Sequence, residues 1–230
     1  MFLCDVDKRD NYLNSGDSIL SLLGKTLGSD PLFVSHQWLI NSPEKRMIYS
    51  HMYGDVLAGK RGSTLDVGGG FCSITNKMIS NGNYYLLDIM AHDNHEDLRN
   101  IEKNCGKNFW INSDWNLFEL NQDYDLIVAN DLFPNVDQRL DAFIEKYLPY
   151  CKELRLSLTY YDNDRSYKVK RVDADEIFYM LAWDGIRLQR TLEKFKDRID
   201  DYDPKLFDNK SSSIFSNGRK VCVLNVRGDK

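Results

Sequence analysis

An apolar stretch at residues 64–67 runs directly into three consecutive glycines at 68–70. Glycine has no Cβ, so the backbone can approach a ligand closely and can adopt φ/ψ values that other residues avoid. Asp66 lies inside the apolar stretch, and a second acid, Asp88, closes the next strand-like run, residues 84–88. A helix starting after the glycines would offer free N–H groups to a carboxylate or phosphate. This arrangement predicts a site for a nucleoside-containing cofactor, with Asp88 at the ribose.

Strand-like and helix-like segments alternate along the chain from residue 63 onward. Alternation of this kind implies a mainly parallel sheet with helices on both faces. A further helix is expected at 173–183, N-capped by Asp173, and a long polar connection at 196–218. Strands are predicted at 64–67, 84–88, 108–112, 124–129 and 153–160, with helices at 71–81, 95–104 and 136–148.

Residues 1–60 lack the alternation of apolar and polar residues that is typical of strands. Apolar residues between 19 and 27 and between 47 and 57 instead recur at helical spacing. Ser42 followed by Pro43 is typical of a helix start, with the serine as the N-cap and the proline in the first turn. We therefore expect an N-terminal helical segment over 1–60, packed beside a main domain over 61–230.

Composition disfavours several classes of partner and location. The formal net charge is −5, and basic residues form only short clusters such as 168–171, so nucleic acid is not expected as a partner. Five widely spaced cysteines show neither a zinc spacing nor a disulfide framework, which suggests a reduced, cytoplasmic protein. No apolar run is long enough to cross a membrane. His92 and His95 lie among acids, but at the start of an exposed helix, so no metal site is predicted.

The glycines do not complete the fingerprints of two common nucleotide sites. A dinucleotide-binding loop needs Gly-x-Gly-x-x-Gly, and the position of its third glycine is occupied by Ser73. A phosphate-binding loop of the Walker A type would need Lys and Ser or Thr after the glycines, and neither follows. An oxidoreductase that uses NAD stays an alternative.

The run from Asp66 to Cys72 resembles the first motif of class I S-adenosylmethionine (SAM) dependent methyltransferases, a strand that ends Asp/Glu-x-Gly-x-Gly-x-Gly, with Cys72 in place of the last glycine. The resemblance implies that Asp88 bonds the ribose hydroxyls, that Asp114 meets the adenine amine and that Trp115 flanks the ring. Residues 124–136 resemble the fourth motif. The implied SAM-binding residues are Asp66, Gly68, Gly69, Gly70, Asp88, Ile89, Asp114, Trp115 and Asn130.

The same resemblance implies the Rossmann-like methyltransferase fold. This fold has a mainly parallel seven-stranded sheet, helices on both faces and a C-terminal antiparallel strand. The last two apolar runs, 186–192 and 220–226, are expected to form the closing antiparallel pair. The N-terminal segment, 1–60, is expected to act as a lid over the acceptor, as is common in this family.

The acceptor is expected to be a small polar molecule that enters beside residues 130–135, above the carboxyl ends of the strands. Asp131 is the leading candidate for a base or an acceptor-binding group, and His36 is a second candidate base. Residues 42–55 resemble bacterial methyltransferases of sugar and surface-polysaccharide pathways, so a sugar or glycan hydroxyl is the first acceptor to consider. An amine N-methyltransferase and a non-catalytic binding protein with this fold stay open, as does an oligomeric state.

Overall fold

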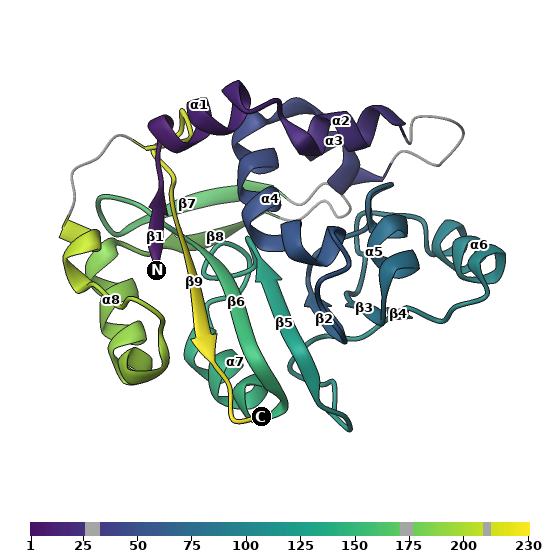
Figure 1. The fold of residues 1–230 in the computed structure, drawn as a ribbon. Helices are drawn as coiled ribbons and strands as arrows, with labels where there is room; N and C mark the ends of the chain where they lie inside the picture. The colour runs from purple at the N-terminus through teal and green to yellow at the C-terminus, as the bar shows by residue number, and fades with distance from the viewer. Residues whose placement is uncertain (26–32, 171–176, 209–212) are drawn as a thin grey trace.

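Seven strands form one sheet in the order β1-β9-β6-β5-β2-β3-β4 (Figure 1). The structure is a computed structural model that describes residues 1–25, 33–170, 177–208 and 213–230. Neighbouring strands from β4 to β6 are parallel, whereas β9 runs antiparallel to both β6 and β1. The fold class predicted from the sequence is therefore confirmed. The strands are β1 (Phe2–Cys4), β2 (Thr64–Val67), β3 (Tyr84–Leu87), β4 (Trp110–Ile111), β5 (Tyr124–Asn130), β6 (Cys151–Tyr160) and β9 (Lys220–Arg227).

Helices cover both faces of this sheet, and each face has its own apolar core. Leu140 and Leu188 belong to the core on one face, and Met47 and Met78 to the core on the other. Ser42 caps α4 as predicted, since its Oγ accepts a hydrogen bond from the Lys45 N–H at 3.2 Å. The helices are α1 (Val6–Asn14), α2 (Ser18–Lys25), α3 (Val34–Asn41), α4 (Pro43–Leu57), α5 (Thr75–Asn81), α6 (His95–Cys105), α7 (Leu140–Tyr147) and α8 (Gly185–Leu192), with 3₁₀ turns η1 (Leu148–Tyr150), η2 (Glu193–Arg198) and η3 (Pro204–Asp208).

The edge of the sheet differs from the sequence prediction. The run 186–192, expected as a strand beside 220–226, is helix α8, and its place next to β9 is taken by β1. The expected N-terminal helical segment therefore also contributes a strand to the main sheet. The helix expected at 71–81 begins only at Thr75, because the backbone stays irregular after the glycines. The division into residues 1–60 and 61–230 stays a prediction.

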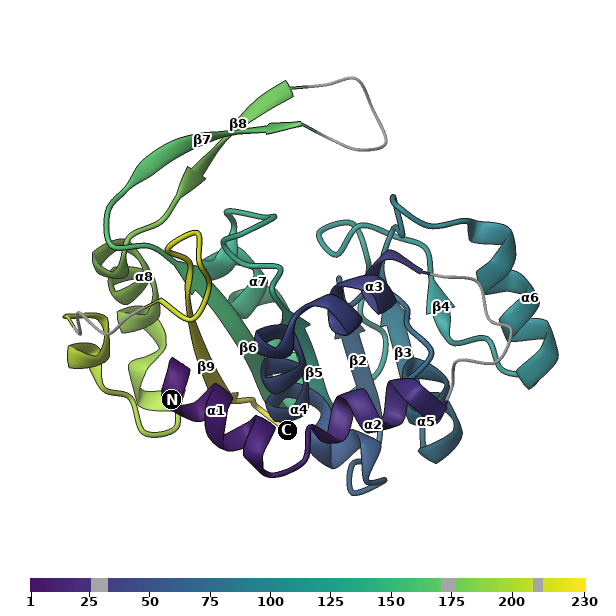
Figure 2. The ribbon, with the colours of Figure 1, turned by 90° about the horizontal axis from the view of Figure 1, so that it is seen from above.

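A separate two-stranded hairpin projects from the main sheet (Figure 2). Its strands are β7 (Arg165–Lys170) and β8 (Ile177–Ala182), paired antiparallel. The base is fixed by the hydrogen bond from the Tyr161 N–H to the Trp183 carbonyl at 2.9 Å. The helix predicted at 173–183 is wrong where it overlaps β8, and its predicted cap, Asp173, lies outside the described residues.

A buried arginine joins α4 to the central sheet. Arg155 on β6 has only 7% of its side chain exposed, and it donates to the Met52 carbonyl at 2.7 Å. Its guanidinium also contacts both carboxyl oxygens of Asp55, at 2.9 and 3.0 Å, and Glu153 at 2.7 Å. Arg61 pairs with the same two acids. This cluster fixes α4, which forms one wall of the cavity described below, against β6.

Candidate functional site

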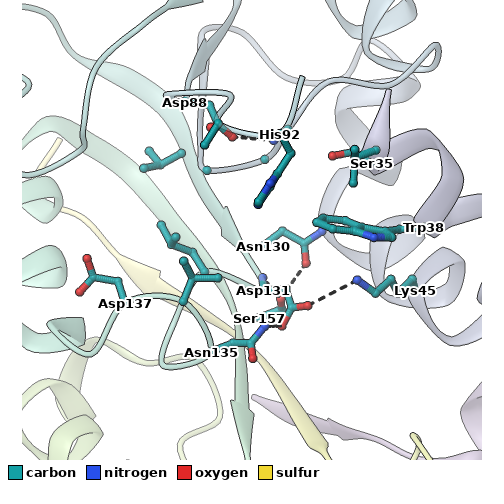
Figure 3. A pocket seen from close by; sticks show the side chains of 18 of the residues that line it. Ser35, Trp38, Lys45, Asp88, His92, Asn130, Asp131, Asn135, Asp137 and Ser157 are labelled. Atoms are coloured by element: carbon teal, nitrogen blue, oxygen red, sulfur yellow. Dashed lines mark hydrogen bonds and ion pairs between the residues drawn. The ribbon is translucent and has the colours of Figure 1, made fainter. Parts of the chain in front are cut away.

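A cavity of about 960 Å³ opens at the carboxyl ends of the parallel strands (Figure 3). Its walls come from the loops after β2, β3, β4 and β5, from α3 and α4, and from the hairpin β7–β8. Ligands of open α/β sheets bind outside the carboxyl ends of the strands, so both the place and the size suit a cofactor together with a second molecule.

The glycine loop forms one wall, and Asp88 fixes it there. Gly68 and Gly70 have φ values of 68° and 63°, in the left-handed region that favours glycine. One carboxyl oxygen of Asp88 accepts a hydrogen bond from the Gly70 N–H at 2.9 Å, and the other accepts from the Met90 N–H at 2.7 Å. The acid predicted to meet a ribose therefore lines the cavity and also joins the loops that follow β2 and β3.

Asp66 lies behind the glycine loop, away from the cavity wall. Its side chain is buried and accepts hydrogen bonds from the hydroxyls of Tyr53, at 2.9 Å, and Tyr84, at 2.5 Å. A Cβ added at Gly69 would lie 2.2 Å from its Oδ2 atom. The structure therefore places Asp66 as a support under the loop, whereas the sequence predicted a residue that binds the cofactor.

Burial raises the pKa of Asp66 to about 7, although hydrogen bonds from Tyr84 and Tyr53 favour its ionised form. Between its ordinary pKa of 3.8 and the folded value, the folded protein holds a proton that the unfolded chain has lost. The contribution of this group to stability is therefore complete below pH 4 and decreases as the pH rises through 7.

Replacing this carboxyl with an amide should remove that pH dependence. We expect the free energy of unfolding of Asp66→Asn to rise relative to the wild type between pH 5 and pH 8, as measured by urea unfolding at both values. The exposed Asp197→Asn serves as the control and should follow the wild type. A constant difference between Asp66→Asn and the wild type at the two pH values would contradict the raised pKa.

Four other residues predicted to bind the cofactor line the cavity. Ile89 is 48% exposed and offers an apolar surface after β3. Asp114 accepts a hydrogen bond from the Asn116 N–H at 2.7 Å. Trp115 is only 5% exposed, and its indole donates to Asp137 at 2.9 Å. Asn130 lies at the end of β5.

The opposite end of the cavity is built around Asp131. This residue has a φ of 59°, and its N–H donates to the Ser157 hydroxyl at 2.8 Å. One carboxyl oxygen accepts from the Thr159 hydroxyl at 2.9 Å, while the other lies 3.2 Å from Arg219 and 3.8 Å from the Lys45 ammonium. Asp131, which the sequence predicted at the acceptor side, lines the cavity together with both cations.

His36, the second candidate base, lies outside the cavity wall. Its side chain is buried in α3, and its Nδ1 is 3.0 Å from the Ser73 hydroxyl. The contact links α3 to the segment after the glycines. The geometry therefore gives His36 a structural role.

Several residues of the cavity wall were not predicted from the sequence as part of the site. Lys45 lies in the first turn of α4, Arg219 precedes β9, and Tyr167 and Met180 come from the hairpin. His92, which follows β3, points into the cavity in Figure 3. Only His92 had a local signal, its closeness to Asp88; the others are brought together by tertiary contacts alone.

The described ranges lack two features, a cluster of metal ligands and a helix suited to crossing a membrane. No group of three or more His, Cys, Asp or Glu side chains in those ranges is placed to hold a metal ion. No helix there has the length and apolar character needed to cross a membrane.

No protein-family model and no curated protein matches the sequence. Solved structures do match. The N-methyltransferase NodS from Bradyrhizobium japonicum WM9, in complex with S-adenosyl-L-homocysteine (SAH), is similar over 91% of this chain and 98% of its own, at 10% identity and a TM-score of 0.51. The N-terminal domain of EvdMO1, solved in the presence of SAH and D-fucose, is similar over 78% of this chain and 81% of its own. The sequence identity is 13% and the TM-score is 0.52. The chain therefore has the fold of these proteins.

Proposed function

We propose that this protein is a SAM-dependent methyltransferase that acts on a small polar acceptor. The observation that carries the proposal is the glycine loop held by Asp88 at the carboxyl edge of the sheet, beside a cavity of about 960 Å³. A third glycine at the position of Ser73 would favour a dinucleotide instead, but this position holds a serine bonded to His36.

The cavity divides into a cofactor end and an acceptor end. At the cofactor end, Asp88 would bind the ribose, while Ile89, Asp114 and the edge of Trp115 would surround the adenine. The backbone of Gly68–Gly70 would lie against the rest of the cofactor, with Asn130 between the two ends. In Figure 3, Asp88 lies near the top of the view, and Asn130 lies between it and the Asp131–Lys45 pair.

SAM supplies an activated methyl group on a sulfonium, so the protein has mainly to align the acceptor with it. Asp131 would act at the acceptor end as a binding or positioning group. Both of its carboxyl oxygens already have donors within the described residues, namely Thr159 and Asn135 on one and Arg219 and Lys45 on the other. These contacts favour a role in organising its neighbours over one as a mobile base.

We propose a sugar or glycan hydroxyl as the first class of acceptor to test, in a cytoplasmic pathway such as polysaccharide biosynthesis. All five cysteines are free, which supports a reducing location. An amine acceptor is the second candidate, and a non-catalytic binding protein the third.

Calorimetric titration with SAM, SAH and NAD in parallel tests the cofactor. We expect micromolar binding of SAM and SAH, and no heat from NAD. Binding of NAD alone would overturn the proposal. Binding of SAH without methyl transfer to any acceptor in a mixed panel of sugars and amines would favour the binding-protein alternative.

Removing the Asp88 carboxyl should weaken SAH binding. Asp88→Ala leaves the Gly70 and Met90 N–H groups without their acceptor and removes the proposed ribose contact. The cost of unsatisfied buried polar groups predicts a loss of about 1–2 kcal/mol, or roughly tenfold in Kd. Asp197→Ala is the control, since Asp197 is exposed and lies in η2. Equal affinity in both variants would refute the placement of the cofactor.

A further inference from the structure

The acceptor end of the cavity contains more positive than negative charge. Lys45 and Arg219 both contact the same carboxylate, Asp131, and their side chains are only 27% and 12% exposed. Lys45 also lies 4.4 Å over the Trp38 ring, and the Arg219 guanidinium lies 4.1 Å over Phe215. Both cations are therefore fixed in place and largely removed from water.

The acids that line the cavity already have partners elsewhere. Asp88 and Asp93 accept hydrogen bonds from backbone N–H groups, Asp114 accepts from the Asn116 N–H, and Asp137 pairs with Arg139. At the acceptor end, Asp131 is the carboxylate that contacts both Lys45 and Arg219, so these three groups together carry one positive charge in excess. Partly buried charges are costly unless they are paired.

The guanidinium of Arg219 has donors to spare. It makes one hydrogen bond within the described residues, at 3.2 Å to Asp131, and its Nε is shielded from water without an acceptor among those residues. A planar guanidinium offers five N–H groups and suits the paired oxygens of a carboxylate or phosphate.

We infer that the acceptor carries a carboxylate or phosphate group, which Lys45 and Arg219 bind at the end of the cavity away from Asp88. This inference rests on the proposed function and narrows it. Aromatic and apolar side chains complete the same end, so the rest of the acceptor would pack against them; they are Trp38, Tyr167, Met180 and Phe215.

A series of three small probes tests the charge requirement. Wild-type protein saturated with SAH, which fills the cofactor end, is titrated with benzoate, phenyl phosphate and benzamide. We expect at least one of the two anions to bind tenfold or more tightly than neutral benzamide. The better of the two anions identifies the carboxylate or the phosphate as the recognised group.

Two double variants show where the anion binds. In Lys45→Gln/Arg219→Gln the preference for the anion should disappear, while the Kd for SAH stays within twofold of the wild type. Lys194→Gln/Arg198→Gln removes two charges from exposed side chains in η2 and should keep the preference.

Three results would overturn the inference. They are equal binding of benzamide and both anions, an anion preference that survives in Lys45→Gln/Arg219→Gln, and a large loss of SAH affinity in that variant. A large loss of SAH affinity would mean that Lys45 and Arg219 bind the carboxylate of the cofactor and not that of the acceptor. A wild-type protein that binds no SAH would instead contradict the proposed function. The three probes would then be titrated without SAH. Equal binding of all three, or an anion preference that survives in Lys45→Gln/Arg219→Gln, would still overturn the inference.

Discussion

The variant Gly69→Ala is expected to bind SAM about 30- to 150-fold more weakly than the wild type. The added Cβ would lie 2.2 Å from the Oδ2 atom of Asp66, a distance that non-bonded atoms cannot keep. Asp66 cannot move aside, because it is buried and held by two tyrosine hydroxyls. The loop must therefore shift toward the cavity, at a cost of about 2–3 kcal/mol, in the range typical of overpacked cores.

Calorimetry with SAM and SAH measures this effect, and circular dichroism confirms that the variant is folded. Gly54→Ala is the matched control, since Gly54 is exposed on α4 and its added Cβ would meet no atom within 4 Å. That control should bind SAM as the wild type does. A Gly69→Ala protein with unchanged affinity would show that the cofactor does not lie against this loop.

Replacing Arg155 with glutamine should lower the free energy of unfolding by about 3 kcal/mol, the lower end of the cost of breaking a buried ion pair. The lower end applies because Arg61 still contacts both acids, Asp55 and Glu153. Burial would raise the pKa of Asp55, but hydrogen bonds from Arg155 and Arg61 outweigh it and hold this pKa well below its ordinary value of 3.8. Urea unfolding at pH 7 measures the loss.

The sign of the pH dependence provides a second check on Arg155→Gln. An acid whose folded pKa is lowered contributes stability above its unfolded pKa and loses that contribution as the pH falls. The gap between variant and wild type should therefore narrow below about pH 4. Arg198 is exposed, so Arg198→Gln should change the free energy of unfolding by less than about 0.5 kcal/mol, both at pH 7 and below about pH 4. If the difference in free energy of unfolding between Arg155→Gln and the wild type stays constant below about pH 4, the ion pair with Asp55 does not cause it.

The sequence predicted the central sheet and brought the glycines and Asp88 to one edge of it because both rest on local signals. Strand β2 is four buried residues followed by glycines, and Asp88 closes a second apolar run. Each signal lies within a few residues, and parallel strands bring their carboxyl ends to the same edge. The placement of Gly68, Gly70 and Asp88 on the cavity wall followed from that geometry.

The C-terminal region was misread where an apolar run fits more than one structure. Leu188 and Leu192 are buried four residues apart, whereas Ile186 is 54% exposed, so one helical face of α8 packs inward. The run in β8 is continuously apolar, and periodicity alone does not distinguish a strand from a buried helix in such a run. The Asp184 cap was a local signal for α8, since its carboxyl accepts from the Arg187 N–H.

The acceptor end was beyond sequence reasoning for a different reason. Lys45, Asp131 and Arg219 are far apart in the chain, and each is an ordinary charged residue in its own surroundings. Only the folding of α4 and β9 against β5 and β6 brings them together. They form one site because Arg219 lies 3.2 Å and Lys45 lies 3.8 Å from the Asp131 carboxylate, and the spacing of these residues in the sequence does not indicate such distances.

The pairing of β1 with β9 sets the order in which this sheet can be completed during synthesis. Phe2 faces Val223 and Cys4 faces Val221, so β1 finds its partner only after the strands from β2 to β8 have been made. Until then β6 also lacks its antiparallel neighbour, β9, and presents an unpaired edge. Contacts between residues so distant in the chain form slowly. The nascent chain is therefore exposed to pairing with other chains while β6 has emerged and β9 has not.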